Sequence, residues 1–447
     1  MAETRSRVLL LNPPHRKRVV RDCYCSDIVK AGYYWHPLDL LIQAGHLAAR
    51  HDVFLFDAIA HRLSDDAVLD LAERLDPDWV LMLVGRAVAD DDREFAEMLR
   101  ESLPQAKLFA SGDLFTARPV EALRQFPMFA GALLEFVSPE FARLVDGREA
   151  IGDVALREDD GIRVLTPLGP SRFSYPPPPL DLIDPQRYRL PFYGGAPFYS
   201  LLASYGCPYG CTFCHVPSLG YKHRDPEEVA VEMRLAYEAD YQNFYLRDAT
   251  FGVRRDDAGN LCERIARIGD DIRWNAFTRA DLLDDELLDL MARSGCAVLQ
   301  IGVETLDRDS AAAVNKRVDH DHLRRLVAAC RRREILTSLH FILGLPGDQW
   351  SQTPQAVRDL IFLEPDYLSV NILAPRPGSA MNDDGLTLPA EQVQRLHKLA
   401  RRINLRFYLR PTRIWAELKR LRSPREILRM LRLFVSSLLP ERLKTIF

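Results

Sequence analysis

The sequence predicts an α/β protein with a doubly wound parallel sheet over residues 1–145, a partial (β/α)6 barrel over 196–385 and a small helical region over 386–447. The main observation is that short apolar runs alternate with segments of helical periodicity in two separate stretches, which is typical of parallel strands covered on both faces. Residues 146–195 separate the two stretches. They include four consecutive prolines from Pro176 and predict an extended linker.

The first stretch predicts four parallel strands and the helices that connect them. Strands are expected at the apolar runs Val8–Leu11, Val53–Phe56, Trp79–Val84 and Lys107–Ala110. Helices are expected near residues 38–50, 65–75 and 91–103. Ligands of such sheets bind beyond the carboxyl ends of the strands, so the residues that follow each run are candidates for binding.

The second stretch predicts six strands with crossover helices, as in a barrel. The expected strands are Tyr199–Ser204, Asn243–Leu246, Arg273–Phe277, Ala297–Gly302, Leu336–Leu343 and Tyr367–Leu373. The expected helices are Glu227–Ala239, Asn260–Ile268, Asp284–Ser294, Asp321–Arg332 and Thr353–Leu363. Chemistry in a barrel of this kind belongs on the loops that follow the strands.

The region from Glu391 reads as helical and basic. Between Arg395 and Phe447, fifteen Lys and Arg residues stand against three Glu, interleaved with apolar residues such as Leu421 and Phe434. One interpretation is a helical cap packed on the barrel with a solvated cationic face. The other is an amphipathic helix that contacts an anionic membrane or substrate.

Composition narrows the function classes. The net charge is -4, which gives no general case for nucleic-acid binding. No apolar run approaches the roughly 18 residues that span a bilayer, and the first apolar run is too short for a secretory signal. We therefore expect a cytoplasmic protein, with peripheral membrane contact through the C-terminal region as the one exception to test.

Eight cysteines in a reducing compartment indicate ligands, redox groups or small core residues. Cys262, Cys296 and Cys330 stand alone in apolar segments and are expected in the core. Cys23 and Cys25 lie in a loop-like stretch and are expected to be solvated thiols.

Cys207, Cys211 and Cys214 form a triplet with the spacing Cys-x-x-x-Cys-x-x-Cys, directly after the first predicted barrel strand. Three interpretations compete. Cys211-Thr-Phe-Cys214-His215 has the form of a c-type haem attachment site. The three thiols with His215 are a possible structural zinc site. The three thiols can also hold three irons of a [4Fe–4S] cluster and leave the fourth iron open to another ligand.

The triplet, with Phe213 before its last cysteine, resembles the radical S-adenosylmethionine (SAM) superfamily. Further segments resemble that family at the expected strand ends. They are Tyr245–Phe251, Trp274–Asp281, Gln300–Thr305, Phe341–Asp348 and Ala374–Ser379. The likeness covers roughly residues 196–385.

The resemblance implies two cofactors, a [4Fe–4S] cluster on Cys207, Cys211 and Cys214 and S-adenosyl-L-methionine on its open iron. One electron passed through the cluster cleaves SAM to methionine and a 5′-deoxyadenosyl radical. The protein positions the reactants and shields the radical.

By position, four further residues are expected to bind SAM. Phe213 is expected near the adenine and Asp248 at the ammonium group. Arg279 is expected at the carboxylate and Glu304 at the ribose hydroxyls.

Residues 1–145 resemble, more loosely, the cobalamin-binding domain that precedes many such barrels. The matching segments are Val8–Pro14, Pro37–Gly45, Val53–Asp57 and Ser111–Asp113. The Asp-x-His-x-x-Gly motif that supplies an axial histidine is absent, and Asp57 with His61 is a poor substitute.

The leading hypothesis is a cobalamin-dependent radical SAM methyltransferase that acts on an unactivated carbon. The alternative is a radical SAM enzyme for oxidative cyclisation, rearrangement or dehydrogenation whose first domain no longer binds cobalamin. Either hypothesis implies a small-molecule or lipid-like substrate and an external electron donor such as flavodoxin or ferredoxin.

Overall fold

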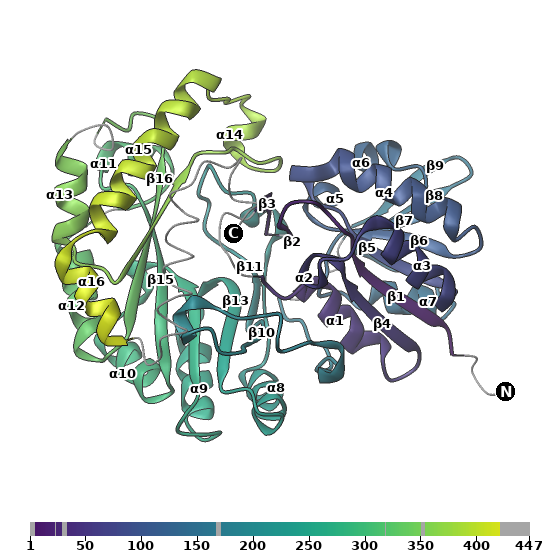
Figure 1. The fold of residues 1–447 in the computed structure, drawn as a ribbon, viewed down its shortest axis with the longest axis horizontal. Helices are drawn as coiled ribbons and strands as arrows, with labels where there is room; N and C mark the ends of the chain where they lie inside the picture. Colours follow the sequence, from purple (N-terminus) through teal and green to yellow (C-terminus); the bar gives the residue numbers. More distant parts are fainter. Residues whose placement is uncertain are drawn as a thin grey trace. The chain divides into compact units, whose positions relative to one another are not determined.

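The computed structural model describes residues 5–22, 24–28, 34–166, 171–317, 319–349 and 354–420. The chain divides into two compact units with the boundary between Leu190 and Pro191. Each unit contains a sheet whose strands are joined by helices (Figure 1).

Among the described residues of the first unit, seven strands form one sheet in the order β4-β1-β5-β6-β7-β8-β9. The strands are β1 (Arg7–Asn12), β4 (Asp52–Asp57), β5 (Trp79–Leu83), β6 (Lys107–Ser111), β7 (Gly131–Leu133), β8 (Val154–Glu158) and β9 (Gly161–Leu165). The first five pair in parallel, while β8 and β9 are antiparallel. The predicted parallel sheet is therefore confirmed, with three further strands at one side.

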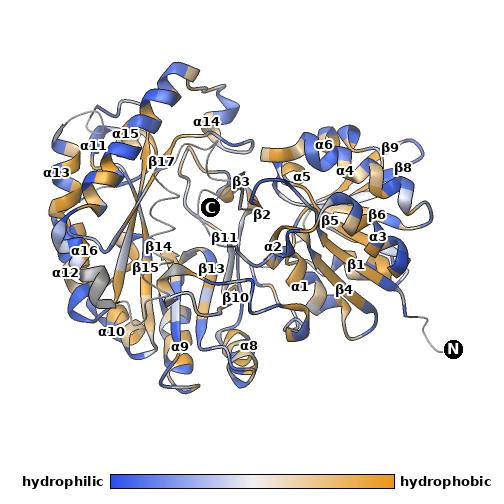
Figure 2. Cartoon of the chain, in the orientation of Figure 1, coloured by the Kyte–Doolittle hydropathy of each residue, from blue (hydrophilic) through white to orange (hydrophobic). Residues whose placement is uncertain are grey.

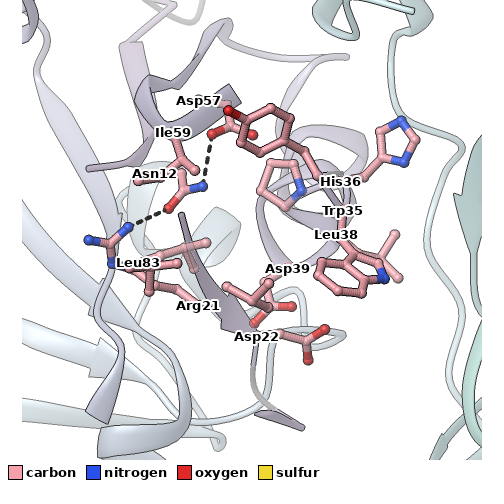
Figure 3. Close-up of a pocket in the computed structure, with 14 residues that line it drawn as sticks. Asn12, Arg21, Asp22, Trp35, His36, Leu38, Asp39, Asp57, Ile59 and Leu83 are labelled. Carbon is pink, nitrogen blue, oxygen red and sulfur yellow. Dashed lines mark hydrogen bonds between the residues drawn. The ribbon is translucent and has the colours of Figure 1, made fainter. Parts of the chain in front are cut away.

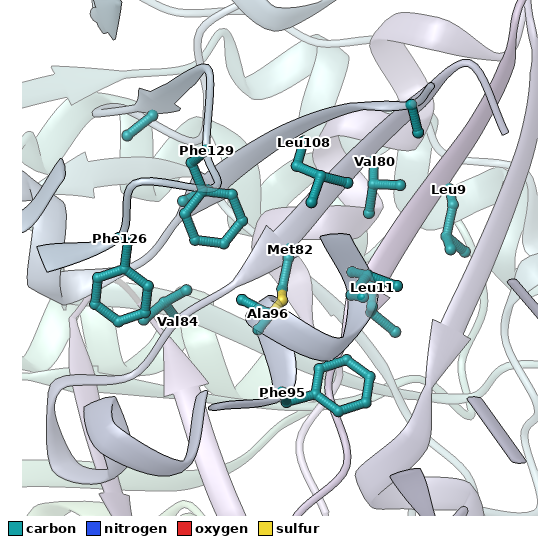
Figure 4. Close-up of a cluster of buried hydrophobic side chains, with 14 of the residues drawn as sticks. Leu9, Leu11, Val80, Met82, Val84, Phe95, Ala96, Leu108, Phe126 and Phe129 are labelled. Carbon is teal, nitrogen blue, oxygen red and sulfur yellow. The ribbon is translucent and has the colours of Figure 1, made fainter. Parts of the chain in front are cut away.

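Helices cover both faces of this sheet, as the continuous apolar runs predict. Val8 and Leu10 of β1 pack beneath α1 (Leu38–Leu47) and α7 (Glu140–Val145). Leu9 and Leu11 point to the opposite face, because side chains alternate along a strand. There they join a core formed with α3 (Asp65–Leu75), α4 (Ala89–Ser102), α5 (Asp113–Ala117) and α6 (Pro119–Gln125), drawn in Figure 4. The strands β1 and β4 are correspondingly hydrophobic in Figure 2.

The stretch expected to be an extended linker, 146–195, differs from that expectation. It contains β8 and β9, which extend the first sheet, and Tyr188, which is 2% exposed and donates a 2.6 Å hydrogen bond to Asp57. The dipeptide Asp160-Gly161, which joins β8 to β9, is typical of a hairpin turn. Most of this stretch belongs to the first unit.

In the second unit, six described strands form a parallel sheet in the order β10-β13-β14-β15-β16-β17. They are β10 (Tyr199–Leu201), β13 (Asn243–Phe251), β14 (Arg273–Thr278), β15 (Cys296–Glu304), β16 (Leu336–Leu343) and β17 (Tyr367–Ile372). The helices α8 (Pro226–Glu238), α9 (Arg255–Ile265), α10 (Asp285–Arg293), α12 (His320–Arg332) and α13 (Pro354–Phe362) connect successive strands. This confirms the predicted partial barrel.

The region after the barrel is helical. It contains α14 (Ala380–Asp383), α15 (Ala390–Tyr408) and α16 (Pro411–Arg420). The buried residues of α15, Leu396, Ala400, Ile403 and Phe407, recur at helical spacing. Tyr408 also bonds the backbone of Leu368 in β17. This part is a cap packed on the barrel, whereas the residues from Leu421 onwards lie outside the described chain.

Candidate functional site

The three cysteines of the triplet lie on one loop between β11 (Ser204–Gly206) and β12 (Tyr221–His223), which pair as an antiparallel hairpin. Gly206 has a φ of 73°, and a Cβ there would stand 1.9 Å from the carbonyl oxygen of Gly220. Only glycine therefore permits this close approach. The N–H of Cys207 donates to the same carbonyl, at 3.0 Å.

Two distant segments also hold the loop. The side-chain amide of Asn315 donates to the carbonyl oxygen of Gly210, at 2.9 Å. The backbone N–H of Met381 donates to the carbonyl oxygen of Thr212, at 3.0 Å. A turn within the loop joins the N–H of Cys214 to the carbonyl oxygen of Cys211, at 3.1 Å. The loop that carries the thiols is thus anchored to residues on two sides of it.

The thiols of the triplet are half-buried and take part in no disulfide. Burial raises the pKa of Cys214 to about 12, and the neighbouring Cys211 and Cys207 raise it further. Burial also raises the pKa of Cys211, against the opposing effect of Lys316 and Arg279. These mutual effects mean that the three thiols are neighbours, and that a bound metal would have to displace the protons of Cys211 and Cys214.

The donor set fits a cluster better than a single ion. Within the described ranges, no three His, Cys, Asp or Glu side chains converge closely enough to hold one metal ion. A zinc site on the three thiols and His215 would require such convergence. An iron–sulfur cluster takes one thiolate at each of several irons and so accepts thiols that stand farther apart.

Arg279 follows β14 and reaches the cysteine loop. Its Nη1 lies 3.9 Å from the Sγ of Cys211, and its guanidinium stands 4.1 Å from the ring centroid of Tyr209. Two further nitrogens bind the carboxylate of Asp281, at 2.8 and 2.9 Å. The predicted site residue therefore lies beside the thiols, with its charge balanced by Asp281.

Glu304 ends β15. Its charge raises the pKa of both Cys211 and Cys214, which indicates that its side chain lies near the loop. The strand register shifts between Gly302 and Glu304, and Glu304 has a φ of 69°. Its carboxylate forms a 2.8 Å ion pair with Lys316. Bulges of this kind redirect side chains next to active sites.

Asp248, which is predicted to lie at the SAM ammonium group, is bound by two neighbouring residues of the chain. It is 2% exposed, and its two oxygens accept hydrogen bonds from the N–H of Ala203 and the hydroxyl of Ser204, at 2.8 and 2.7 Å. Burial raises its pKa to about 6. The side chain therefore braces the segment before Cys207.

Phe213 packs against a small hydrophobic cluster, which is formed by Val314, Leu345, Leu373 and Met381. It is only partly buried, which leaves ring surface for a ligand. The hydroxyl of Thr250, at the end of β13, lies 3.4 Å from the Sγ of Cys207. The loop thus meets residues from several strand ends.

Sequence reasoning missed Thr250, Tyr209, Asn315 and Lys316 as neighbours of the site. Tyr209 lies between Cys207 and Cys211, and Thr250 lies in the segment Tyr245–Phe251, so the sequence could have indicated both positions. Asn315 and Lys316 follow the small helix α11 (Arg308–Ala313), and nothing in their local sequence marks them. The structure also confirms Cys262, Cys296 and Cys330 as buried core residues.

The carboxyl edge of the first sheet contains a small pocket (Figure 3). At its floor, Asn12 donates to Asp57 at 2.9 Å and accepts from Arg21 at 3.1 Å. Arg21 in turn forms a buried 2.6 Å ion pair with Asp92. The Asp57 carboxylate also accepts from Tyr188, so it is held by partners other than an imidazole.

Two histidines lie near this edge. His61, the weak substitute for an axial ligand, is exposed at the end of α2 (Ala58–His61). His36 lines the pocket and stacks on Tyr188 with ring centroids 4.1 Å apart, and burial lowers its pKa to about 3. The pair Asp57 and His61 therefore does not fit the arrangement of an axial histidine.

The comparisons with known proteins agree with these observations. Residues 201–360 match the model of the radical SAM superfamily. The chain is 24% identical to an uncharacterized methyltransferase of Pyrococcus horikoshii over 91% of this chain and 93% of that protein. It is 25% identical to the anaerobic magnesium-protoporphyrin IX monomethyl ester cyclase of Synechocystis over 83% of this chain and 75% of that protein.

Among solved structures, the fold is similar to that of TsrM from Kitasatospora setae, a radical SAM methyltransferase with cobalamin and a [4Fe–4S] cluster bound. The TM-score is 0.68 and the identity 19%, with 85% of this chain and 78% of that chain covered. The likeness therefore extends over both units. Residues 201–360, which include the cysteine loop, are therefore similar to the radical SAM superfamily of enzymes.

Proposed function

We propose that the protein is a cobalamin-dependent radical SAM methyltransferase that acts on an unactivated carbon. A radical SAM domain implies SAM and a [4Fe–4S] cluster. The observation that carries the proposal is that one anchored loop presents Cys207, Cys211 and Cys214. Arg279 and Glu304, which come from two different strand ends, lie next to that loop.

In this proposal the three thiolates hold the cluster, and the charged neighbours orient SAM. When bound, the cluster and SAM together supply a 5′-deoxyadenosyl radical. Arg279 binds the SAM carboxylate by exchanging part of its contact with Asp281 for the ligand. Glu304 accepts hydrogen bonds from the ribose hydroxyls, and Phe213 covers one side of the adenine.

Asp248 keeps its place in the proposal as a positioning residue. By accepting hydrogen bonds from residues 203 and 204, it fixes the strand from which the cysteine loop starts. The adjacent Thr250 hydroxyl lies within reach of the Cys207 sulfur. Hydrogen bonds to cluster sulfurs are one means by which a protein tunes a cluster.

The first unit is proposed to hold cobalamin at the carboxyl edge of its sheet, where ligands of such sheets bind. Cobalamin, when bound, carries the methyl group to be transferred. The similarity of fold to TsrM and the full-length methyltransferase relative support this proposal. Because the Asp57 carboxylate is engaged by Asn12 and Tyr188, we propose binding without a histidine from the Asp57–His61 pair.

A second candidate function is a radical SAM cyclase, rearrangement or dehydrogenation reaction without cobalamin. The absence of the axial-histidine motif from the sequence and the similarity to a ring-forming cyclase favour it. The same cluster and SAM residues would serve both reactions. The two candidates differ in whether the first unit binds a corrinoid and whether a methyl group reaches the product.

The remaining partners belong to the proposal as well. The substrate is a small or lipid-like molecule, and an external donor such as flavodoxin or ferredoxin supplies the electron. Ile414 and Trp415 of α16 are exposed, which is compatible with peripheral contact at a membrane. Among the described residues, no helix has the length and apolar character needed to cross one.

Anaerobic reconstitution with iron, sulfide and hydroxocobalamin, followed by reaction with SAM and a strong reductant, tests the proposal. We expect 5′-deoxyadenosine and S-adenosylhomocysteine together, and retention of the corrinoid on gel filtration. With SAM that carries a deuterated methyl group, mass spectrometry of a cell extract should reveal a mass-shifted product. Formation of 5′-deoxyadenosine without corrinoid or S-adenosylhomocysteine would favour the second candidate, and no SAM cleavage would contradict both.

A further inference from the structure

A buried ion pair lies beside the cysteine loop, and the sequence motifs did not single out its cation. The Nζ of Lys316 is 2.8 Å from the Oε1 of Glu304 and donates to the carbonyl oxygen of Gly302, at 2.7 Å. The two side chains are only 8% and 12% exposed. Removing one partner would leave the other charge buried without its counterion, so each side chain fixes the place of the other.

Gly302 provides the space in which the pair lies. A Cβ at this position would stand 2.6 Å from the Oε1 of Glu304 and 3.0 Å from the Nζ of Lys316. The carboxylate and the ammonium group therefore occupy the volume that a side chain at residue 302 would fill.

That volume is on the inner face of the barrel sheet. Gly302 is paired in register with His340. The ring centroid of His340 lies 5.1 Å from that of Phe277. Trp274, three residues before Phe277 on β14, lies on the opposite, helix-covered face, where its indole donates to Ser294 beside α10. Since side chains alternate along a strand, Phe277, His340 and the ion pair face away from those helices.

The backbone of Glu304 adds a second observation. Its φ of 69° lies in the left-handed region, which a residue with a long side chain adopts only when the surroundings hold it there. Lys316 binds both the carboxylate of Glu304 and the backbone carbonyl two residues earlier. One ammonium group thus holds both ends of the bulge that carries Glu304.

Lys316 also lies near the cysteine loop and the inner face of the sheet. The residue before it, Asn315, donates to the carbonyl oxygen of Gly210 in the loop, at 2.9 Å. The charge of Lys316 adds to the effect of burial that lowers the pKa of His340 to about 4.

We propose that Lys316 is a positioning residue of the SAM site, which holds the Glu304 carboxylate in place for the ribose hydroxyls. Because Lys316 binds Oε1, the second oxygen of Glu304 remains for the ligand. The inference rests on the proposed role of Glu304 and goes beyond it, since it assigns a residue with no contact to the ribose itself.

Two substitutions test the inference by different routes. Lys316→Met removes the charge, and Gly302→Ala keeps both charged groups but displaces them from their place. Lys398→Met is the matched control, because Lys398 is exposed on α15. Each protein is reconstituted anaerobically, its iron content is measured, and its affinity for SAM is determined by calorimetry without turnover.

We expect Lys316→Met and Gly302→Ala to retain the iron content of the wild type and to bind SAM about tenfold more weakly. This factor corresponds to the loss of one charge-assisted hydrogen bond, that between Glu304 and the ribose. Lys398→Met should bind SAM like the wild type. The losses in Lys316→Met and Glu304→Gln should not add in the double variant, because one side chain acts through the other. A purely structural role would lower thermal stability without this coupling.

The inference is overturned if Lys316→Met and Gly302→Ala both bind SAM as tightly as the wild type, or if the losses at residues 304 and 316 add. These results leave the proposed function intact whenever the wild type still cleaves SAM. A wild type that assembles a cluster but neither binds nor cleaves SAM overturns the proposed function together with the inference.

Discussion

The Asp248 carboxylate accepts a 2.7 Å hydrogen bond from the Ser204 hydroxyl and a 2.8 Å bond from the neighbouring Ala203 N–H. Asp248 belongs to β13, whereas Ser204 begins the short strand that leads into the cysteine loop. The contact therefore joins the barrel sheet to the loop that carries the thiols. It also places an ionisable group where water has almost no access.

Asp248→Asn should flatten part of the pH dependence of stability. The ordinary pKa of Asp is 3.8, and burial raises that of Asp248 to about 6 in the folded protein. Between these values the folded state binds the proton more tightly than the unfolded state. The free energy of unfolding therefore falls as pH rises from about 4 to about 6, by up to about 3 kcal/mol. Urea unfolding at a series of pH values measures this fall, and equal falls in both proteins would contradict the prediction.

Gly206→Ala should prevent the cysteine loop from forming its site. The new Cβ would lie 1.9 Å from the Gly220 carbonyl oxygen, at a φ of 73°. The hairpin must open, with loss of the bond from Cys207 to that carbonyl and a cost above about 1 kcal/mol. We expect less iron per chain after reconstitution. Gly210→Ala is the control, because a Cβ there meets nothing within 4 Å. Equal iron contents would count against the prediction.

Replacing Cys207, Cys211 or Cys214 singly with Ala should abolish the cluster. Each thiolate is expected to hold a separate iron, so the loss of one leaves a second iron open. Iron and sulfide analysis with electron paramagnetic resonance of the reduced protein measures the effect. Cys330→Ala is the matched control, because Cys330 is a fully buried core residue and should cost stability alone. A normal cubane signal in any of the three single variants would refute the ligand assignment.

Tyr188→Phe should destabilise the first unit at neutral pH. Burial raises the pKa of Asp57, and the hydrogen bond from Tyr188 opposes that rise. Without it, keeping the carboxylate ionised becomes more costly, by about 1.5–3 kcal/mol for a hydrogen bond to a charged group. Tyr237→Phe removes a similar 2.8 Å bond, to the surface residue Asp271, and should change stability little. Urea unfolding at pH 7 compares the two, and equal effects would argue against the buried network.

By itself, the sequence determined the two parallel sheets and the cysteine triplet. Both kinds of signal are local. A continuous apolar run such as that of β1 predicts a strand buried on both faces, and a proline such as that at the start of α8 predicts the first turn of a helix. Only the tertiary structure decided that Tyr188 packs on the first unit, that Asp248 braces a strand and that Lys316 binds Glu304. These contacts join residues that are distant in sequence, or they depend on a bulge. Their geometry is set by the packing of the whole fold, which the spacing of neighbouring residues does not determine.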